Sequence, residues 1–330
     1  MYLPHRIRED ELTKDSMRFF SMINEETMKM NEEKILNKAL SLLNDEGEKS
    51  AYMYLLKQKE KRDDWSGQYY NFLYCFAGIN GAVEEAKAYL EEAIIEKGFW
   101  YRTEVFQDED LDCIRDTDSF KACLEISEYR YQKALECAET VSTWKEKRKE
   151  KLAIALHGNQ QNINDAKRSW QFLEKVGYQV ECVQSKEIDA HNIFRWEDKG
   201  SGPEQLIDAI GKIKMADYDE HILCGFSSGC NTILRTLISF DLPCDTILLQ
   251  SPWIPMIIED LQALVAVIEE KDIRLIIVCG TEDVECFGQS LQLYEALSQS
   301  AIKVEKHWLE GLDHEFPENF DQLIKMSMAY

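Results

Sequence analysis

The spacing of apolar residues changes near residue 150, and this change divides the chain into two parts. From residue 8 to about residue 148, apolar residues recur at helical intervals and the positions between them are polar. The segment 81–99 shows this best, because its apolar residues share one face and Gly98 follows as a C-cap. We find no strand-like alternation there, so the pattern predicts an all-α domain over residues 1–148.

Part of this helical region resembles a tetratricopeptide helix pair. In residues 70–99, two helical segments flank a tight turn that contains glycine, and the small residues Ala86 and Ala93 fall where the helices would approach. The sequence has no clean 34-residue period, which leaves an irregular helical bundle as the alternative. The charged run 142–151 that follows is typical of a solvated helix end or a linker.

Beyond residue 148, short apolar runs alternate with longer helical patterns, which is typical of a parallel sheet with helices on both faces. The predicted strands are residues 152–158, 178–184, 221–225, 245–250, 273–280 and 302–309. The second and sixth alternate apolar with polar residues, as edge strands do, whereas the other four are almost continuously apolar. The pattern predicts an α/β domain over residues 149–330. Its sheet is mainly parallel and six-stranded, in the order second, first, third, fourth, fifth, sixth.

Candidate catalytic residues follow three of these strands. Ser227 lies in the sequence Gly-Phe-Ser-Ser-Gly after the third strand, Asp283 comes three residues after the glycine that ends the fifth, and His314 follows the sixth. The carboxyl ends of parallel strands meet at one edge of a sheet, so we expect these side chains to lie close together. Glu282 is the alternative acid. His307 is the alternative base, but it lies within a strand and is interpreted as structural.

A Gly-x-Ser-x-Gly motif between a strand and a helix resembles the nucleophile elbow of the α/β-hydrolase family, and the resemblance covers roughly residues 152–330. It implies that Ser227 is a nucleophile, that His314 is its general base, and that Asp283 orients the imidazole. The glycines two residues before and after the serine let the strand and the helix approach closely. The sequence differs from the family's usual fold in two ways. It has an additional helical half, and it lacks the two N-terminal strands of the sheet.

The same resemblance implies an oxyanion hole. The backbone N–H of Ser228 would be one donor, and Asn159 or Gln160, after the first strand, would supply the second. His157 would shape this loop and not act as the base. The choice between Asn159 and Gln160 stays open.

At several further residues the sequence resembles bacterial serine esterases of the phospholipase/carboxylesterase group. They are Trp170, Gly177, Tyr178, Trp196, Glu197 and Asp198. Phe226, Trp196 and Trp253 could line an acyl pocket, although aromatic packing under loops explains each of them equally well. Residues 254–270 leave room for a single crossover helix, so no lid is expected at that point.

Composition narrows the range of functions. The chain has 61 acidic and 38 basic side chains and a formal net charge of −23, which disfavours nucleic acid and anionic membrane surfaces as partners. No apolar stretch approaches the length of a membrane span, and the N-terminus has no signal-peptide pattern. The ten cysteines form no CxxC pair, so they are expected to be reduced residues of a cytoplasmic protein without a metal site.

The sequence therefore predicts a cytoplasmic serine hydrolase that cleaves a small-molecule carboxylic ester or thioester through an acyl-enzyme, without a cofactor. An acyltransferase or a peptidase with the same three residues is an alternative. A helical-repeat interaction protein with a non-catalytic hydrolase scaffold is another. The helical half is expected either to cover part of the pocket or to bind a protein partner through a tetratricopeptide-like groove.

Overall fold

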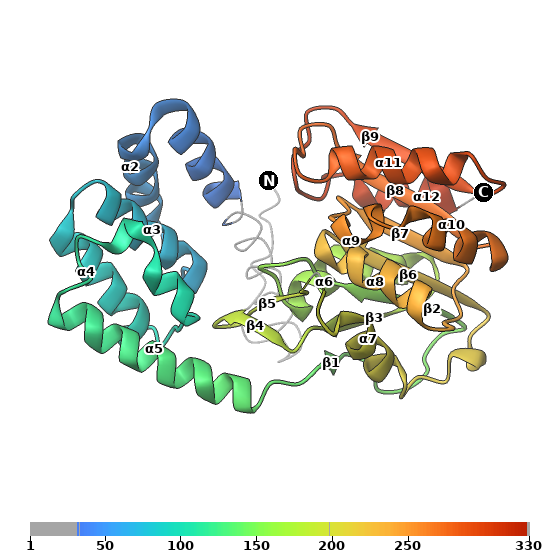
Figure 1. The fold of residues 1–330 in the computed structure, drawn as a ribbon, viewed down its shortest axis with the longest axis horizontal. Helices are drawn as coiled ribbons and strands as arrows, with labels where there is room; N and C mark the ends of the chain where they lie inside the picture. The colour runs from blue at the N-terminus through green and yellow to red at the C-terminus, as the bar shows by residue number, and fades with distance from the viewer. Residues whose placement is uncertain (1–31, 33, 198, 329–330) are drawn as a thin grey trace, which may run out of the picture. The chain divides into compact units, whose positions relative to one another are not determined.

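A computed structural model describes residues 32, 34–197 and 199–328 of the chain (Figure 1). The chain divides into two compact units, of which the first ends at Tyr131 and the second begins at Gln132. Each unit is described by itself. The domain boundary between residues 148 and 149 stays a prediction, and Asp198 lies outside the described residues.

The first unit is helical, as the sequence predicts. Its elements are a helix over residues 34–46, α2 (Glu48–Lys59), α3 (Gly67–Ile79), α4 (Val83–Glu91) with a π-helical turn (Glu92–Glu96), two 3₁₀ turns (Thr103–Gln107 and Glu109–Leu111) and α5 (Asp118–Glu136). Helices α3 and α4 pack against each other across a short turn in which Gly81 has a φ of 71°. The likeness of this pair to a tetratricopeptide repeat stays a prediction.

This unit has a core of its own, and the core is rich in tyrosine. Tyr69 and Tyr101 are 0% and 2% exposed, so their hydroxyl groups need partners inside the protein. The Tyr69 hydroxyl donates to the Leu55 carbonyl oxygen and the Tyr101 hydroxyl to that of Gly67, each at 2.5 Å. The side chains are therefore buried without leaving a polar group unsatisfied.

The second unit is built on a seven-stranded sheet. Its strands are β1 (Val141–Ser142), β2 (Lys151–Leu156), β3 (Tyr178–Gln184), β6 (Glu220–Phe226), β7 (Thr246–Gln250), β8 (Arg274–Gly280) and β9 (Val304–Leu309), in the order β1-β3-β2-β6-β7-β8-β9. All six predicted strands are present in the predicted order and are parallel.

The predicted count of six strands is wrong by one. Strand β1 pairs antiparallel with β3, so β3 is not the outermost strand, and the region expected to hold only helices contributes a strand. A strand of two residues is too short to show an alternating pattern, which is why the sequence analysis missed it.

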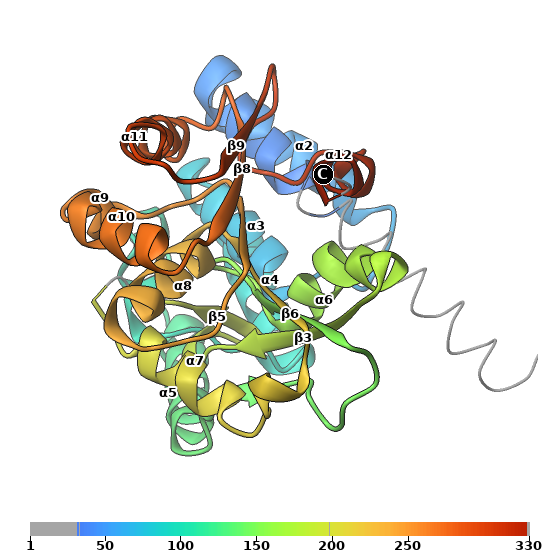
Figure 2. The same cartoon turned by 90° about the vertical axis from the view of Figure 1, so that its right-hand side faces the viewer.

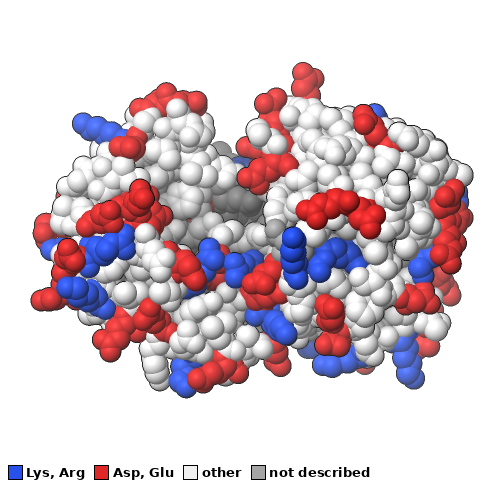
Figure 3. All heavy atoms as spheres, in the orientation of Figure 1, with Lys and Arg blue, Asp and Glu red and all other residues white. Residues whose placement is uncertain are grey.

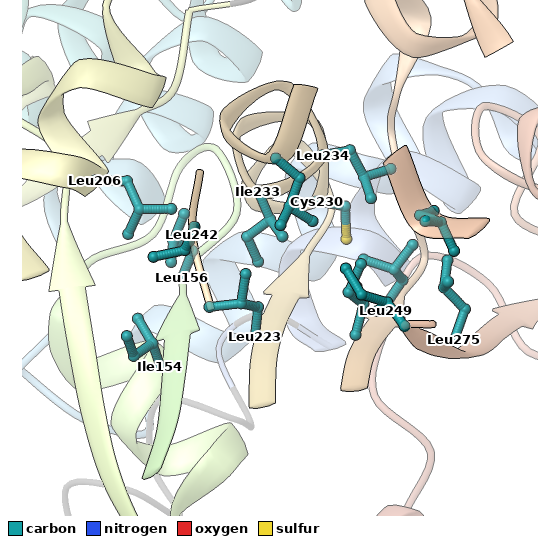
Figure 4. Packing of buried hydrophobic residues seen from close by; sticks show 14 of the residues in the cluster. Ile154, Leu156, Leu206, Leu223, Cys230, Ile233, Leu234, Leu242, Leu249 and Leu275 are labelled. Carbon is teal, nitrogen blue, oxygen red and sulfur yellow. The ribbon is translucent and has the colours of Figure 1, made fainter. Parts of the chain in front are cut away.

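Helices cover both faces of this sheet, as the apolar strands require. The helices of the second unit are α6 (Ile163–Trp170), α7 (Gly202–Ile210), α8 (Ser228–Ser239), α9 (Pro255–Ile258), α10 (Leu261–Glu270), α11 (Phe287–Ser298) and α12 (Phe320–Met328). One face packs against α7, α8, α10 and α11, and the other against α6 and α12 (Figure 2). On the first face, Leu223 and Leu249 of the strands meet Ile233 and Leu234 of α8 (Figure 4).

A β-hairpin lies between β3 and α7, where the sequence analysis expected only helix. Strands β4 (Glu187–Ala190) and β5 (Ile193–Arg195) pair antiparallel, and Phe194 also bridges to Gln161 of the loop after β2. The strands have only four and three residues, which is too short for a clear period in the sequence.

The surface carries both signs of charge, with acidic side chains spread over both units on the face drawn in Figure 3. Within the described ranges, no helix combines the length and the apolar character needed to cross a membrane.

Candidate active site

Ser227 occupies a sharp turn between β6 and α8. Its φ of 52° and ψ of −123° are values that a residue with a side chain rarely adopts, and it is the N-cap residue of α8. The two flanking glycines make this turn possible. A Cβ on Gly225 would lie 2.8 Å from the Cys230 nitrogen, and one on Gly229 would lie 2.6 Å from the His157 carbonyl oxygen. The close approach expected of an elbow is therefore present in the backbone.

The Ser227 side chain is buried but unpaired. The residue is 8% exposed, and within the described part of the chain its hydroxyl group makes no hydrogen bond. Its backbone is fixed instead, because the Ser227 N–H donates to the Gln250 carbonyl oxygen and the Ser227 carbonyl oxygen accepts from the Trp253 N–H. A free hydroxyl on a fixed backbone is available to react.

Asp283 and His314 lie together at the neighbouring strand ends. The Nδ1 atom of His314 donates to Oδ2 of Asp283 at 2.8 Å, and the Cys286 N–H donates to Oδ1 at 3.1 Å. Asp283 is 1% exposed, so its carboxylate cannot form hydrogen bonds with bulk water, and these two protein donors take the place of water. Gly280 allows the two loops to meet, because a Cβ there would lie 2.0 Å from the Leu312 carbonyl oxygen.

The pair stabilises the charges of both groups. Burial opposes the charged form of Asp283, but the hydrogen bond and charge of His314, together with hydrogen bonds from Ser251 and Cys286, hold the pKa of Asp283 below its ordinary value. Burial likewise opposes the charged form of His314, yet Asp283, and then Glu285 and Asp313, raise the pKa of His314 above 6.5. Asp283 is therefore ionised at neutral pH and holds the imidazole with Nε2 free of this bond.

Aromatic packing brings the imidazole next to the serine turn. The ring of Phe226, the residue directly before Ser227, lies 5.0 Å from the His314 ring and 4.8 Å from the Phe316 ring, measured between centroids. Phe226 is 3% exposed. Its packing against His314 links the β6 turn to the loop after β9.

The predicted oxyanion residues form a tied loop after β2. Oδ1 of Asn159 accepts from the Ser228 hydroxyl at 2.7 Å and from the Trp196 N–H at 2.8 Å. Gln160 has a φ of 64°, and its side chain donates to Asp189 of the hairpin. The loop is thus held against the N-terminus of α8, where backbone N–H groups are free to bind an anion.

The predicted pocket residues, His157 and the alternative acid and base differ in their burial and in their hydrogen-bond partners. Trp196 is 1% exposed and donates through Nε1 to the His157 carbonyl oxygen, so it packs beneath the loop, while Trp253 is half-buried. His157 is fully buried, and burial lowers its pKa to about 4. Glu282 is exposed, and His307 bonds to Glu305 and Ser327.

Gln250, at the end of β7, is a residue that the sequence analysis missed. Its carbonyl oxygen accepts from Ser227, and its amide Nε2 donates to the Glu315 carbonyl oxygen at 2.8 Å and to the Ser251 hydroxyl at 3.1 Å. It therefore ties the turn of Ser227 to the loop of His314. The sequence offered one signal for this role, because the polar residues Gln250 and Ser251 end an otherwise apolar strand.

Two groups of side chains among the described residues could offer ligand atoms to a metal ion. They are Asp283, Cys286 and His314, and Cys75, Asp108 and Asp110. The first group already uses its polar atoms in the hydrogen bond between His314 and Asp283.

Comparison with known proteins identifies the family. The model of the A/B hydrolase-like, N-terminal domain matches residues 31–135. The crystal structure of an uncharacterized protein from Bacillus cereus ATCC 10987 is 32% identical, with a TM-score of 0.53, and the match covers 90% of this chain and 97% of that one. The chain belongs to the α/β-hydrolase superfamily, in a form that carries this N-terminal domain.

More distant structures match 58% of the chain. A phospholipase/carboxylesterase from Dyadobacter fermentans DSM 18053 is 12% identical with a TM-score of 0.45, over 58% of this chain and 97% of that one. The acyl-protein thioesterase 2 of Zea mays is 18% identical with a TM-score of 0.41, over 58% and 98%. No curated protein matches the chain.

The close approach at the elbow predicts a large cost for adding one methyl group. Gly229→Ala places a Cβ against the backbone of His157, so we expect the free energy of unfolding to fall by about 1–3 kcal/mol. Gly288→Ala in α11 is the matched control, because nothing lies within 4 Å of its Cβ position. Urea unfolding followed by tryptophan fluorescence measures both. Equal stability of the two variants would contradict the close approach.

Proposed function

We propose that the protein is a serine hydrolase that cleaves a carboxylic ester or thioester. The observation that carries this proposal is the hydroxyl of Ser227, which has no partner among the described residues and lies on a strained turn. The preceding residue, Phe226, packs against His314, whose Nδ1 is held by buried Asp283. A nucleophile, a base and a group that orients the base are the parts that such chemistry needs.

The reaction would proceed in two halves. Ser227 Oγ attacks the acyl carbon and its proton passes to Nε2 of His314, while Asp283 stabilises the imidazolium that forms. The proton then goes to the leaving alcohol or thiol as its bond to the acyl carbon breaks. Water then attacks the acyl carbon of the acyl-enzyme and gives up a proton to Nε2 of His314. The bond between the acyl carbon and Ser227 Oγ breaks as that proton passes to Oγ, which releases the acid and restores the serine.

Charge on the tetrahedral intermediate needs donors that are already in place. The backbone N–H of Ser228, at the start of α8, is one, and an N–H of Asn159 or Gln160 is proposed as the second. The Asn159 side chain supports this arrangement, because it accepts from both Ser228 and Trp196 and so holds the loop against the elbow. One such donor contributes about 10²–10³ in kcat in a well-studied protease.

Removing the nucleophile should remove the activity and little else. We expect Ser227→Ala to lower kcat for p-nitrophenyl acetate by about 10⁶-fold, because the nucleophile is removed. The fold should be unaffected, because the hydroxyl group makes no hydrogen bond among the described residues. Circular dichroism and the melting temperature serve as controls for folding. A variant that keeps a tenth of the wild-type rate would overturn the assignment and direct attention to Ser228.

The acid can be tested against its neighbour. Asp283→Asn should lower kcat by about 10⁴-fold, because an amide favours the wrong imidazole tautomer, as it does in another Ser-His-Asp enzyme. Glu282→Gln is the matched control, because that side chain is exposed and the two residues are adjacent. We expect its kcat to stay within about threefold of the wild type. The reverse result would make Glu282 the acid.

The pH profile should report the charge around His314. The base must be neutral, so kcat/KM should fall as the pH drops through the raised pKa of His314, with a midpoint above 6.5. Asp283→Asn should move this midpoint downward, because Asp283 is the strongest of the groups that raise it. A profile that is flat between pH 5 and 8 would contradict a histidine base.

A further inference from the structure

Three of the loops that border the proposed site are acidic and contain neither Lys nor Arg. Three stretches, residues 251–260, 281–286 and 310–319, directly follow the carboxyl ends of β7, β8 and β9, and none of them contains a Lys or an Arg. They carry Glu285, two residues after Asp283, and Asp313, directly before His314.

The carboxylates of Glu285 and Asp313 are exposed, and within the described residues neither forms an ion pair. Elsewhere in the same unit, acidic side chains pair with basic ones, such as Glu220 with Lys151 at 2.6 Å and Asp272 with Lys303 at 3.0 Å. The negative charge near the site is therefore not neutralised by the chain's own residues in these loops.

This charge reaches the site itself. Burial lowers the pKa of His314, whereas Asp283 and then Glu285 and Asp313 raise it, so the field of the two exposed carboxylates acts at the imidazole. The same field acts on any charged substrate whose acyl group is bound to Ser227. Ser227 is itself 8% exposed, with a hydroxyl that has no partner among the described residues.

Aromatic rings add a second kind of attraction for cations. Phe226 packs against the His314 ring and Phe316 packs against Phe226, while the half-buried Trp253 donates its backbone N–H to the Ser227 carbonyl oxygen at 3.3 Å. Phe316 and Trp253 are only half-buried, unlike Phe226, and the accessible faces of aromatic rings attract ammonium groups, above all quaternary ones. Arg195 of the hairpin is paired with Glu197 at 3.0 Å, so its charge is largely compensated.

We propose that the site selects esters or thioesters that carry a positive charge within about 8 Å of the scissile bond, a distance over which exposed charges still interact at physiological salt. It discriminates against anionic thioesters such as those of coenzyme A. This inference rests on the proposed function and names the substrate class of that same site.

Three thioesters of one acyl group test the proposal on the full-length protein. They are butyrylthiocholine, its neutral carbon isostere S-(3,3-dimethylbutyl) thiobutyrate, and butyryl-coenzyme A, and release of the thiol is followed for each. At low salt we expect kcat/KM for the cation to exceed that for the neutral isostere by about tenfold, and the anion to be the poorest. The ratio should shrink as salt screens the charges.

Variants locate the source of the selectivity. Glu285→Gln and Asp313→Asn should each reduce the ratio of cationic to neutral kcat/KM by about threefold. Glu270→Gln is the matched control, because that residue ends α10 just before β8 begins, at the opposite edge of the sheet. It should leave the ratio unchanged.

The outcomes separate this inference from the proposed function. Turnover of all three thioesters at equal rates, or a ratio that neither salt nor the two variants change, would overturn the charge selectivity alone. If p-nitrophenyl acetate and all three thioesters are inert, the proposed function fails and the inference fails with it.

Discussion

The backbone of Ser227 is the constraint on which the rest of the site depends. A residue with a side chain in this conformation costs about 1–3 kcal/mol, and the surrounding structure has to supply that energy. Helix α8 does so, because Ile233, Leu234 and Leu237 are at most 2% exposed, and burying each contributes about 1.5–3 kcal/mol. The packing of the core therefore maintains the strained turn that fixes the position of the hydroxyl.

A second set of contacts positions the base relative to this turn. Gln250 accepts from the Ser227 N–H with its backbone carbonyl oxygen and donates to the loop of His314 with its side-chain amide, so one buried residue connects two loops that lie far apart in the sequence. Phe226 makes the same connection through its ring. Catalysis by positioned groups is sensitive to displacements of about 1 Å, which explains why such links belong in a hydrolase site.

The period of the apolar residues was enough to predict the strands and their order. Strands that are buried on both faces, such as β6 and β8, have continuous apolar sequences, whereas an edge strand such as β9 alternates apolar with polar residues. Strand β1 and the β4–β5 hairpin are too short to have a period. The role of Gln250 could not be predicted either, because its partners Ser227 and Glu315 come together only in the folded chain.

The most direct test of the account is to label the native protein with a fluorophosphonate and map the adduct by mass spectrometry. Such a reagent reacts with a serine that a neighbouring base has activated. The account predicts one adduct per chain, on the peptide that contains Ser227, and its loss when Ser227 is replaced by alanine. An unlabelled chain, or an adduct on any other serine, would contradict the central claim.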